Sequence, residues 1–348
     1  MLVSRPLHTR YLPGLLAIIP LVIASCGPGV SPKTPFVHLS GQQLGALVDS
    51  VLTGSAEMRR ASLASLDSLG DDRVASMLVD RLRSPDSRTR SEARRVLTKL
   101  SLHGGLRSLY AATGDTSVFV RWSVVYALGF RHGEGLDSVL QVASRDPSVA
   151  VRRAAVLSIA HLPDSLLPPL LEPLRNDPAE EVRAAVAEAL VNAPHADSLL
   201  VEMVETDVGM VVTAAVKALG MRRTRSVAAV VGVKLLDGAS DTRVAAARAL
   251  GNIGGEEATV LLLASAADDP LPLVRESAVL GLAQCAPDRV PTLLRERKRA
   301  ENDVFVRMAW VYALEQIGTE EGRRILGELA VDDPSPEVRA AARAARVR

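Results

Sequence analysis

The residues most able to hold a metal ion are four histidines that recur along the chain. His103, His132, His161 and His195 follow one another at intervals of 29, 29 and 34 residues. A metal holds its ligand nitrogens at about 2 Å, whereas packed helical layers lie about 10 Å apart. We therefore expect these histidines to be polar loop residues, or residues at helix C-termini that the helix dipole favours. The sequence predicts no metal site and no cofactor.

Other signatures of catalysis are missing from the sequence. It contains no His-Glu pair, no Gly-rich phosphate loop and no helical zinc motif with two histidines. We therefore expect that the protein is not an enzyme. The alternative is a lyase-like enzyme, or an enzyme subunit, that binds a small molecule in the concavity of the fold, because a site assembled from several repeats leaves no local motif.

The first 26 residues carry a different chemistry, that of export and lipid attachment. Two arginines precede an apolar run, Leu15 to Ala24, which is about half the roughly 20 residues that a membrane span needs. The sequence Ile-Ala-Ser-Cys ending at Cys26 resembles the bacterial lipobox, and Gly27 resembles the second residue of lipoproteins sorted to an outer membrane. The resemblance implies cleavage after residue 25 and lipidation of Cys26.

These features predict the domain organisation of the N-terminal part. Residues 1–25 are predicted to be a lipoprotein signal peptide, and residues 26–40 a lipidated cysteine with a flexible tether. The expected location is the bacterial cell envelope, with the lipid in the outer membrane and the protein facing the periplasm. The expected membrane contact is made through the N-terminal lipid.

From residue 41 to the end, the chain repeats one unit. When the copies are aligned on their closing Ala-Leu, the same position is occupied by Arg59, Arg90, Arg121, Arg152, Arg183, Val212, Arg243, Arg275, Arg307 and Arg339. A period of about 31 residues is typical of solenoids. Each copy has two amphipathic runs at helical spacing, and such short helices bury an apolar face only by stacking on neighbours. The pattern predicts an all-α protein, a right-handed α-solenoid of about ten helical hairpins over residues 41–348.

The copies resemble HEAT repeats, and in particular the short HEAT-like repeats of phycobilin lyases, over roughly Gly41 to Arg348. In HEAT families an Asp in the turn and an Arg six positions later form a ladder between layers. The matching pairs are Asp115/Arg121, Asp146/Arg152, Asp177/Arg183, Asp237/Arg243, Asp269/Arg275 and Asp333/Arg339. The resemblance implies that these arginines are internal ladder residues and do not form a phosphate-binding row. Val212, and the lack of Asp six residues before Arg90 and Arg307, depart from the pattern.

Two positions of the second helix vary in character from copy to copy. They lie one and five residues after the repeat Arg and are neighbours on one helix face. Because the packing positions repeat while these do not, we expect a surface, which in HEAT-like stacks lies on the concave side. Aromatic residues and Arg are enriched at binding hot spots. The predicted partner-binding residues are Trp122, Tyr126 and Arg153 in one patch and Met308 and Tyr312 in a second.

The alternative is that these rings only cover neighbouring helices. Trp310 stands at a position that is normally small, so we expect it to fill a gap between layers. The formal charge of +1 gives no reason to expect a polyanionic partner, and the export signal argues against nucleic acid. The sequence therefore predicts an envelope lipoprotein that acts as an interaction scaffold for a protein or peptide partner.

Overall fold

The computed structural model describes residues 39–69, 72–100, 105–297 and 300–347. These residues form twenty α-helices and contain no strand, so the all-α class predicted from the sequence is confirmed. None of the helices in these ranges combines the length and the apolar character that crossing a membrane requires. The chain divides into two compact units, at Leu162 and Pro163, and each is described by itself.

The first unit consists of four helical hairpins, which begin at Gly41. Its helices are α2 (Gly41–Thr53), α3 (Ala56–Leu69), α4 (Asp72–Leu82), α5 (Ser87–Lys99), α6 (Leu106–Ala112), α7 (Val118–Leu128), α8 (Leu136–Ala143) and α9 (Val149–Ile159). Ser40 caps α2 with a capping box, and the preceding Leu39 is buried. The Leu39 carbonyl also accepts a hydrogen bond of 2.9 Å from Arg73. The last two residues before α2 are therefore fixed to the fold.

The second unit consists of six hairpins. Its α-helices are α10 (Leu167–Leu171), α11 (Glu180–Ala189), α12 (Asp197–Thr206), α13 (Gly209–Arg222), α14 (Ala228–Asp237), α15 (Ser240–Ile253), α16 (Glu256–Asp268), α17 (Pro272–Cys285), α18 (Val290–Arg297), α19 (Val304–Ile317), α20 (Glu320–Asp332) and α21 (Pro336–Val347). Short 3-10 turns η1 (Asp164–Leu166), η2 (Glu172–Asn176), η3 (Leu190–Asn192), η4 (Arg225–Val227) and η5 (Pro287–Arg289) complete it. Helix α10 is short because Pro173, which has no N–H, falls in the next turn of the chain.

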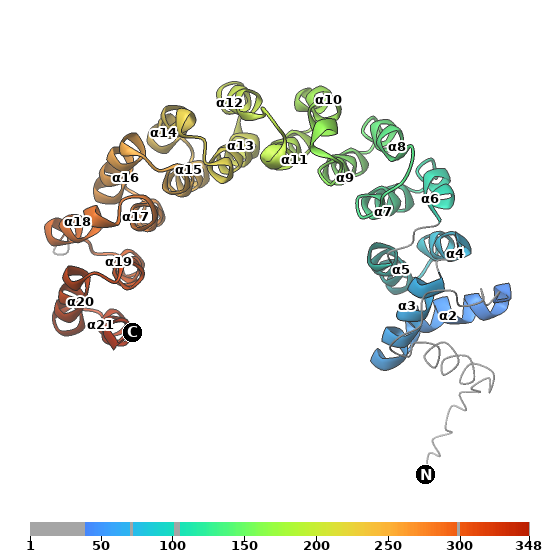
Figure 1. Ribbon diagram of the computed structural model, residues 1–348, viewed down its shortest axis with the longest axis horizontal. Coiled ribbons are helices and arrows are strands. Elements are labelled where there is room, and N and C mark those ends of the chain that lie inside the picture. The colour runs from blue at the N-terminus through green and yellow to red at the C-terminus, as the bar shows by residue number, and fades with distance from the viewer. Residues whose placement is uncertain (1–38, 70–71, 101–104, 298–299, 348) are drawn as a thin grey trace, which may run out of the picture. The chain divides into compact units, whose positions relative to one another are not determined.

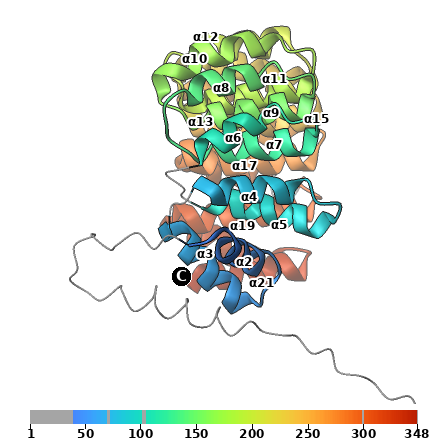
Figure 2. The same cartoon turned by 90° about the vertical axis from the view of Figure 1, so that its right-hand side faces the viewer.

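Within each unit the helices form two layers. The first helix of each hairpin packs on its own second helix, except that η2 takes this place against α11, and successive second helices such as α5, α7 and α9 pack on one another (Figure 1). Viewed from the side, α4 and α5 lie next to each other, as do α6 and α7 (Figure 2). Residues of each second helix that point neither into the hairpin nor toward the next layer therefore form one continuous surface within a unit.

One position of the repeat places a buried aliphatic side chain in the core of every layer from α3 to α19. Seven residues after the repeat Arg, the second helices carry Leu or Ile with at most 1% exposure; these are Leu66, Leu97, Leu128, Ile159, Leu190, Leu219, Leu250, Leu282 and Leu314. Small residues allow the second helices to approach closely. A Cβ built on Gly251 would lie 2.6 Å from the Gly281 Cα, so only glycine fits there without moving the backbone.

Candidate binding surface

The repeat arginines form a ladder inside each unit. In the first unit Arg121 Nε donates to Asp146 Oδ2 at 2.7 Å and Nη2 to Asp146 Oδ1 at 3.0 Å. Equivalent pairs in the second unit are Arg183–Asp207, Arg243–Asp269, Arg275–Glu301 and Arg307–Asp333. The arginine side chains of these pairs are 7–19% exposed. They are internal structural residues, as the resemblance to HEAT repeats implied.

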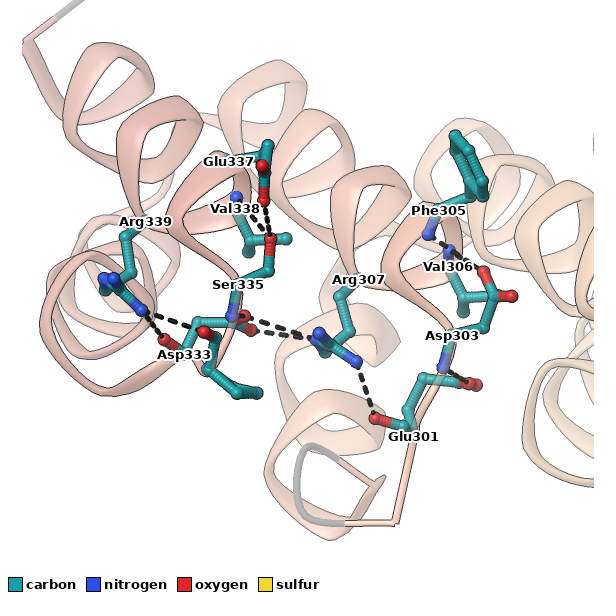
Figure 3. Close-up of polar contacts among 11 residues, drawn as sticks. Glu301, Asp303, Phe305, Val306, Arg307, Asp333, Ser335, Glu337, Val338 and Arg339 are labelled. Atoms are coloured by element: carbon teal, nitrogen blue, oxygen red, sulfur yellow. Dashed lines mark hydrogen bonds and ion pairs between the residues drawn. The ribbon is translucent and has the colours of Figure 1, made fainter.

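The ladder differs in one respect from the pairing expected from the sequence. The carboxylate that binds each of these arginines comes from the turn of the following repeat. The residue six positions earlier contributes its main-chain carbonyl, except at Arg243, which donates to the carbonyl of Gly238. Arg307 lies in this way between the Glu301 carbonyl, at 3.1 Å, and the Asp333 carboxylate (Figure 3). Glu301 replaces the missing Asp before Arg307 and binds Arg275 through both carboxylate oxygens. Each Arg–carboxylate pair therefore joins the second helix of one repeat to the turn of the following repeat.

The turn carboxylates also organise the backbone that precedes each second helix. Each accepts a hydrogen bond of 2.8–2.9 Å from the amide two residues further on; the acceptors are Asp115, Asp146, Asp177, Asp269, Glu301 and Asp333. The hydrogen bond from Arg183 holds the pKa of Asp207 below its usual range. Burial disfavours the ionised form of Asp146, but hydrogen bonds from Arg121 and the Ser148 amide outweigh it, so the pKa of Asp146 is also lowered. Asp146 and Asp207 are therefore held in their charged form.

Two places in the ladder depart from the repeat. Val212 is buried, and among the described residues the exposed Asp237 side chain has no hydrogen bond or ion pair. In the first unit Arg83, just after α4, donates to Asp115 Oδ2 at 2.9 and 2.7 Å. Arg83 thus takes the acid that the repeat Arg90 would bind. Arg90 instead places its guanidinium carbon 5.6 Å from the centre of the Phe119 ring.

The aromatic residues of α7 form one continuous row. Ring centres are separated by 5.8 Å between Phe119 and Trp122, 6.3 Å between Trp122 and Tyr126, and 5.4 Å between Tyr126 and Phe130. Phe130 in turn lies 5.4 Å from the His161 ring, which follows α9. Residue spacings of three and four place these side chains on one helix face. Trp122 and Tyr126 are half-buried and Phe130 is 44% exposed, so the row is open to solvent.

Arg94 on α5 covers part of this row. Its guanidinium carbon lies 4.9 Å from the centre of the Trp122 ring, within cation–π distance. The equivalent position in the neighbouring second helices is apolar, for example Val125 in α7 and Val156 in α9, both fully buried. The Arg94 Nε is buried and has no hydrogen-bond partner. The indole ring is therefore the main contact that orients this guanidinium.

Basic side chains flank the row on both sides. The four positions that hold Phe119, Trp122 and Tyr126 in α7 and Phe130 just after it hold Arg88, Ser91, Arg95 and Lys99 in α5 and Ala150, Arg153, Leu157 and His161 in and after α9. We call these positions the stripe. The predicted site residue Arg153 is exposed and belongs to the stripe, one repeat beyond Trp122 and Tyr126. Among the described residues, Arg153 contacts none of the rings through a cation–π interaction.

The second predicted patch, on α19, has a different environment. Met308 is half-buried and Tyr312 is 55% exposed, and Phe305, two residues before the ladder Arg, is 70% exposed. Phe305 was missed by sequence reasoning that considered only two stripe positions. Trp310 is 1% exposed and fills the interior, as its place in the repeat indicated. Within the described ranges, the rings of Phe305 and Tyr312 make no ring–ring contact, whereas the neighbouring rings of the α7 row touch one another.

The remaining candidates from the sequence are the four histidines and Cys26. His132 and His161 are exposed, His195 has a left-handed backbone (φ 55°), and His103 lies outside the described residues. Among the described residues, no three His, Cys, Asp or Glu side chains lie close enough to hold a metal ion. Cys26, the predicted lipid attachment site, also lies outside them.

A hollow of about 450 Å³ on the surface of the second unit is lined in part by ladder residues. It is lined by Arg175, Asn176, Asp177, Pro178, Arg183, Glu202, Met203, Thr206 and Asp207. Arg175 pairs there with Glu202, and Arg183 with Asp207. Because its charged groups neutralise one another, the hollow does not favour the small-molecule alternative.

These features define an α-solenoid whose hairpins are joined by an arginine–carboxylate ladder and whose second helices carry a variable surface. A model of HEAT repeats matches residues 136–220, 200–283 and 269–346. The chain therefore belongs to the HEAT-repeat family. No curated protein sequence gives a significant match.

Solved structures share this fold at low sequence identity. The Kap95:Nup1 complex matches with a TM-score of 0.56 and 12% identity, over 86% of this chain and 50% of that chain. Kap95p in its complex with RanGDP matches with a TM-score of 0.53 and 13% identity, over 88% of this chain and 51% of that chain. The chain thus spans about half the length of these relatives. The CpcE–CpcF complex of phycocyanin lyase from Nostoc matches with a TM-score of 0.34 and 16% identity, over 68% of this chain and 97% of that chain.

Proposed function

We propose that this protein is a lipid-anchored scaffold of the bacterial envelope that binds a protein or peptide partner through its second-helix surface. The fold supports a non-covalent role, because stacked hairpins expose a long surface whose residues vary while the ladder and core repeat. Binding would rest on many weak contacts around a few anchors. We expect the partner to bind the concave face, which the second helices line in HEAT-like stacks.

The observation that carries this proposal is the aromatic row of α7. Four rings in mutual contact, open to solvent and touched by Arg90 and Arg94, occur in a chain that is only 3% aromatic. Rings held by their neighbours lose little conformational freedom on binding, which favours affinity. Trp122 and Tyr126 are the central anchors of this surface.

The partner role can be tested by capture from the native envelope. The anchored protein and its Trp122→Ala/Tyr126→Ala variant are purified after mild crosslinking, and captured proteins are identified by mass spectrometry. The matched control is Leu236→Ala/Val331→Ala, which truncates two exposed apolar side chains on the first helices α14 and α20, outside the second-helix surface. We expect the first variant, and not the control, to lose captured proteins while both keep their helicity. Equal capture by all three proteins contradicts the proposal.

The anchor is a separate part of the proposal and rests on the lipobox-like sequence that ends at Cys26. Two or three acyl chains on one residue give stable membrane attachment, which a single chain does not. Metabolic labelling with palmitate should mark the wild-type protein and leave Cys26→Ala unlabelled. Label that persists in the variant would show that the lipid is elsewhere.

A further inference from the structure

The stripe of the first unit is strongly basic. On α3, α5, α7 and α9, including the residues just after α7 and α9, its positions carry five basic residues, Arg60, Arg88, Arg95, Lys99 and Arg153, and one acidic residue, Glu57. The formal charge of +1 for the whole chain conceals this concentration. The aromatic row of α7 lies between the basic positions of α5 and α9.

The stripe of the second unit has the opposite balance. Among its described residues the same repeat positions carry five acidic residues, Glu181, Glu188, Asp241, Glu276 and Glu337, and two basic residues, Lys217 and Arg248. Both stripes occupy the same place in the repeat, so the difference does not follow from the fold. It is a property of the surface that each unit presents.

Much of the positive charge around the row is uncompensated. Arg95 pairs with Glu92 at 2.6 Å. Arg88, Lys99 and Arg153 are exposed, and among the described residues their side chains form no ion pair or hydrogen bond. Exposed cations beside open rings present a surface complementary to carboxylates and apolar groups together.

Building on the proposed function, we infer that the partner of the first unit is an extended acidic protein segment with an apolar or aromatic residue at its centre. Neighbouring second helices lie about 10 Å apart, which is roughly three residues of extended chain. An apolar side chain on Trp122 and Tyr126 would therefore place carboxylates about three residues away on each side. Those on one side would meet Arg88 and Lys99, and those on the other would meet Arg153.

The rings are arranged for a side chain rather than for stacked nucleobases. Trp122 has Arg94 over its ring and lies beside Phe119 and Tyr126, and Phe130 meets Tyr126 edge-on. The row therefore forms a ridge without gaps between its rings. Single-stranded nucleic acid uses separate ring faces on which successive bases stack. Nucleic acid and anionic lipid are therefore outcomes for the experiment to distinguish.

The experiment uses the protein carrying Trp310→Phe, in which Trp122 is the remaining tryptophan of the two in the sequence. Emission from Trp122 is followed during titration with three short peptides of equal length. One has a central phenylalanine with glutamates about three residues away on each side, the second has lysines in place of the glutamates, and the third has serines. Phosphatidylglycerol vesicles and a thymidine oligonucleotide serve as competing anionic probes.

We expect the glutamate peptide to bind at least about tenfold more tightly than the other two, with affinity that falls as salt rises. The variant Arg88→Glu/Lys99→Glu/Arg153→Glu should lose this preference. Lys217→Glu/Arg248→Glu, which removes the stripe cations of the second unit, should keep it. Equal binding of the three peptides, tighter binding of vesicles or oligonucleotide, or self-association that the triple variant abolishes would each overturn the inference.

The inference and the proposed function fail in different ways. If the triple charge variant still captures the native partner while Trp122→Ala/Tyr126→Ala does not, the surface is a binding site and the acidic class of partner is wrong. If neither variant changes capture, the proposed function itself fails.

Discussion

Helices α7 and α19 have nearly the same sequence and different surfaces. Both begin Val-Phe-Val-Arg, and both carry Val-Tyr-Ala-Leu at equivalent positions. In α7 the rings form a row in mutual contact, with Phe119 and Trp122 half-buried. In α19 the corresponding Phe305 is 70% exposed, and the second large ring, Trp310, is inside the fold.

Part of the difference lies in the helices themselves, because Met308 and Gln316 replace Trp122 and Phe130, and part lies in the preceding repeat. Before α7, Arg83 binds Asp115, which leaves Arg90 to lie against Phe119, and Arg94 reaches Trp122. Before α19, Arg275 binds Glu301 and the position equivalent to Arg94 is the buried Val279. The distinct surface of α7 therefore combines two additional rings at the stripe positions with arginine contacts from the neighbouring layer.

The largest contrast expected between the two helices concerns their tryptophans. Trp310→Ala empties a fully buried position and should lower the free energy of unfolding by about 3–5 kcal/mol. Trp122→Ala removes a half-buried ring at the surface and should cost less than half as much. Urea denaturation of both variants checks the order. Equal losses would show that the α7 row is part of the core.

Ladder rungs should make stability depend on pH in both units. The pKa of Asp146 is lowered in the folded protein, so the pair with Arg121 stabilises the fold above the ordinary carboxyl pKa of about 4. That contribution is lost as the pH falls through the lower pKa of the folded state. Arg121→Gln should cost about 1–3 kcal/mol at neutral pH and flatten the loss of stability between about pH 5 and pH 2.

Denaturation midpoints measured over this pH range check the ladder prediction. Arg88→Gln, at an exposed position of the stripe, is the matched control and should follow the wild-type curve. An Arg121→Gln curve parallel to that of the wild type would exclude the pair as the source of the pH dependence.

A smaller effect is expected for the contact between Arg94 and Trp122, which should stabilise the protein beyond ordinary packing. A double-mutant cycle of Arg94→Met and Trp122→Leu should give a coupling energy of about 0.5–2 kcal/mol, because a cation over an indole is attracted by its ring electrons. The cycle requires four denaturation curves. A coupling energy of zero would mean that the two side chains are neighbours without mutual stabilisation.

The smallest effect is expected on α19. Phe305→Ala and Tyr312→Ala remove exposed rings and should each change the free energy of unfolding by less than about 0.5 kcal/mol. Thermal denaturation of the two variants checks this. A larger loss of stability would show that these rings pack against other parts of the protein.

The repeat made most of the fold predictable from the sequence. The hairpins, the buried Leu positions and the interior place of Trp310 follow from periodic patterns. The Arg ladder was implied by the resemblance to HEAT repeats, although each Arg binds the acid of the following turn and not the one expected. The partner exchange at Arg83 could not be predicted in this way, because Arg83 lies outside the repeated position and binds an acid 32 residues away.

The binding surface was only partly predictable. Trp122 and Tyr126 are signalled by their unusual types at two variable positions, but the row also includes Phe119 and Phe130, at spacings of three and four residues from them. Extending the pattern to four positions per helix would have found both rings, and Phe305 as well. Contacts with Arg90 and Arg94 depend on the neighbouring layer, and nothing in the helix that carries the rings reports them.

The most direct test of the α7 surface is acrylamide quenching of Trp122 in the Trp310→Phe protein, with and without the glutamate peptide. A bound segment should cover the half-buried indole, so the account predicts that the peptide lowers the quenching constant of Trp122. The same peptide should leave the quenching of Trp310 in a Trp122→Phe protein unchanged. Peptide binding that leaves Trp122 as accessible as before would contradict the assignment of the row as the binding site.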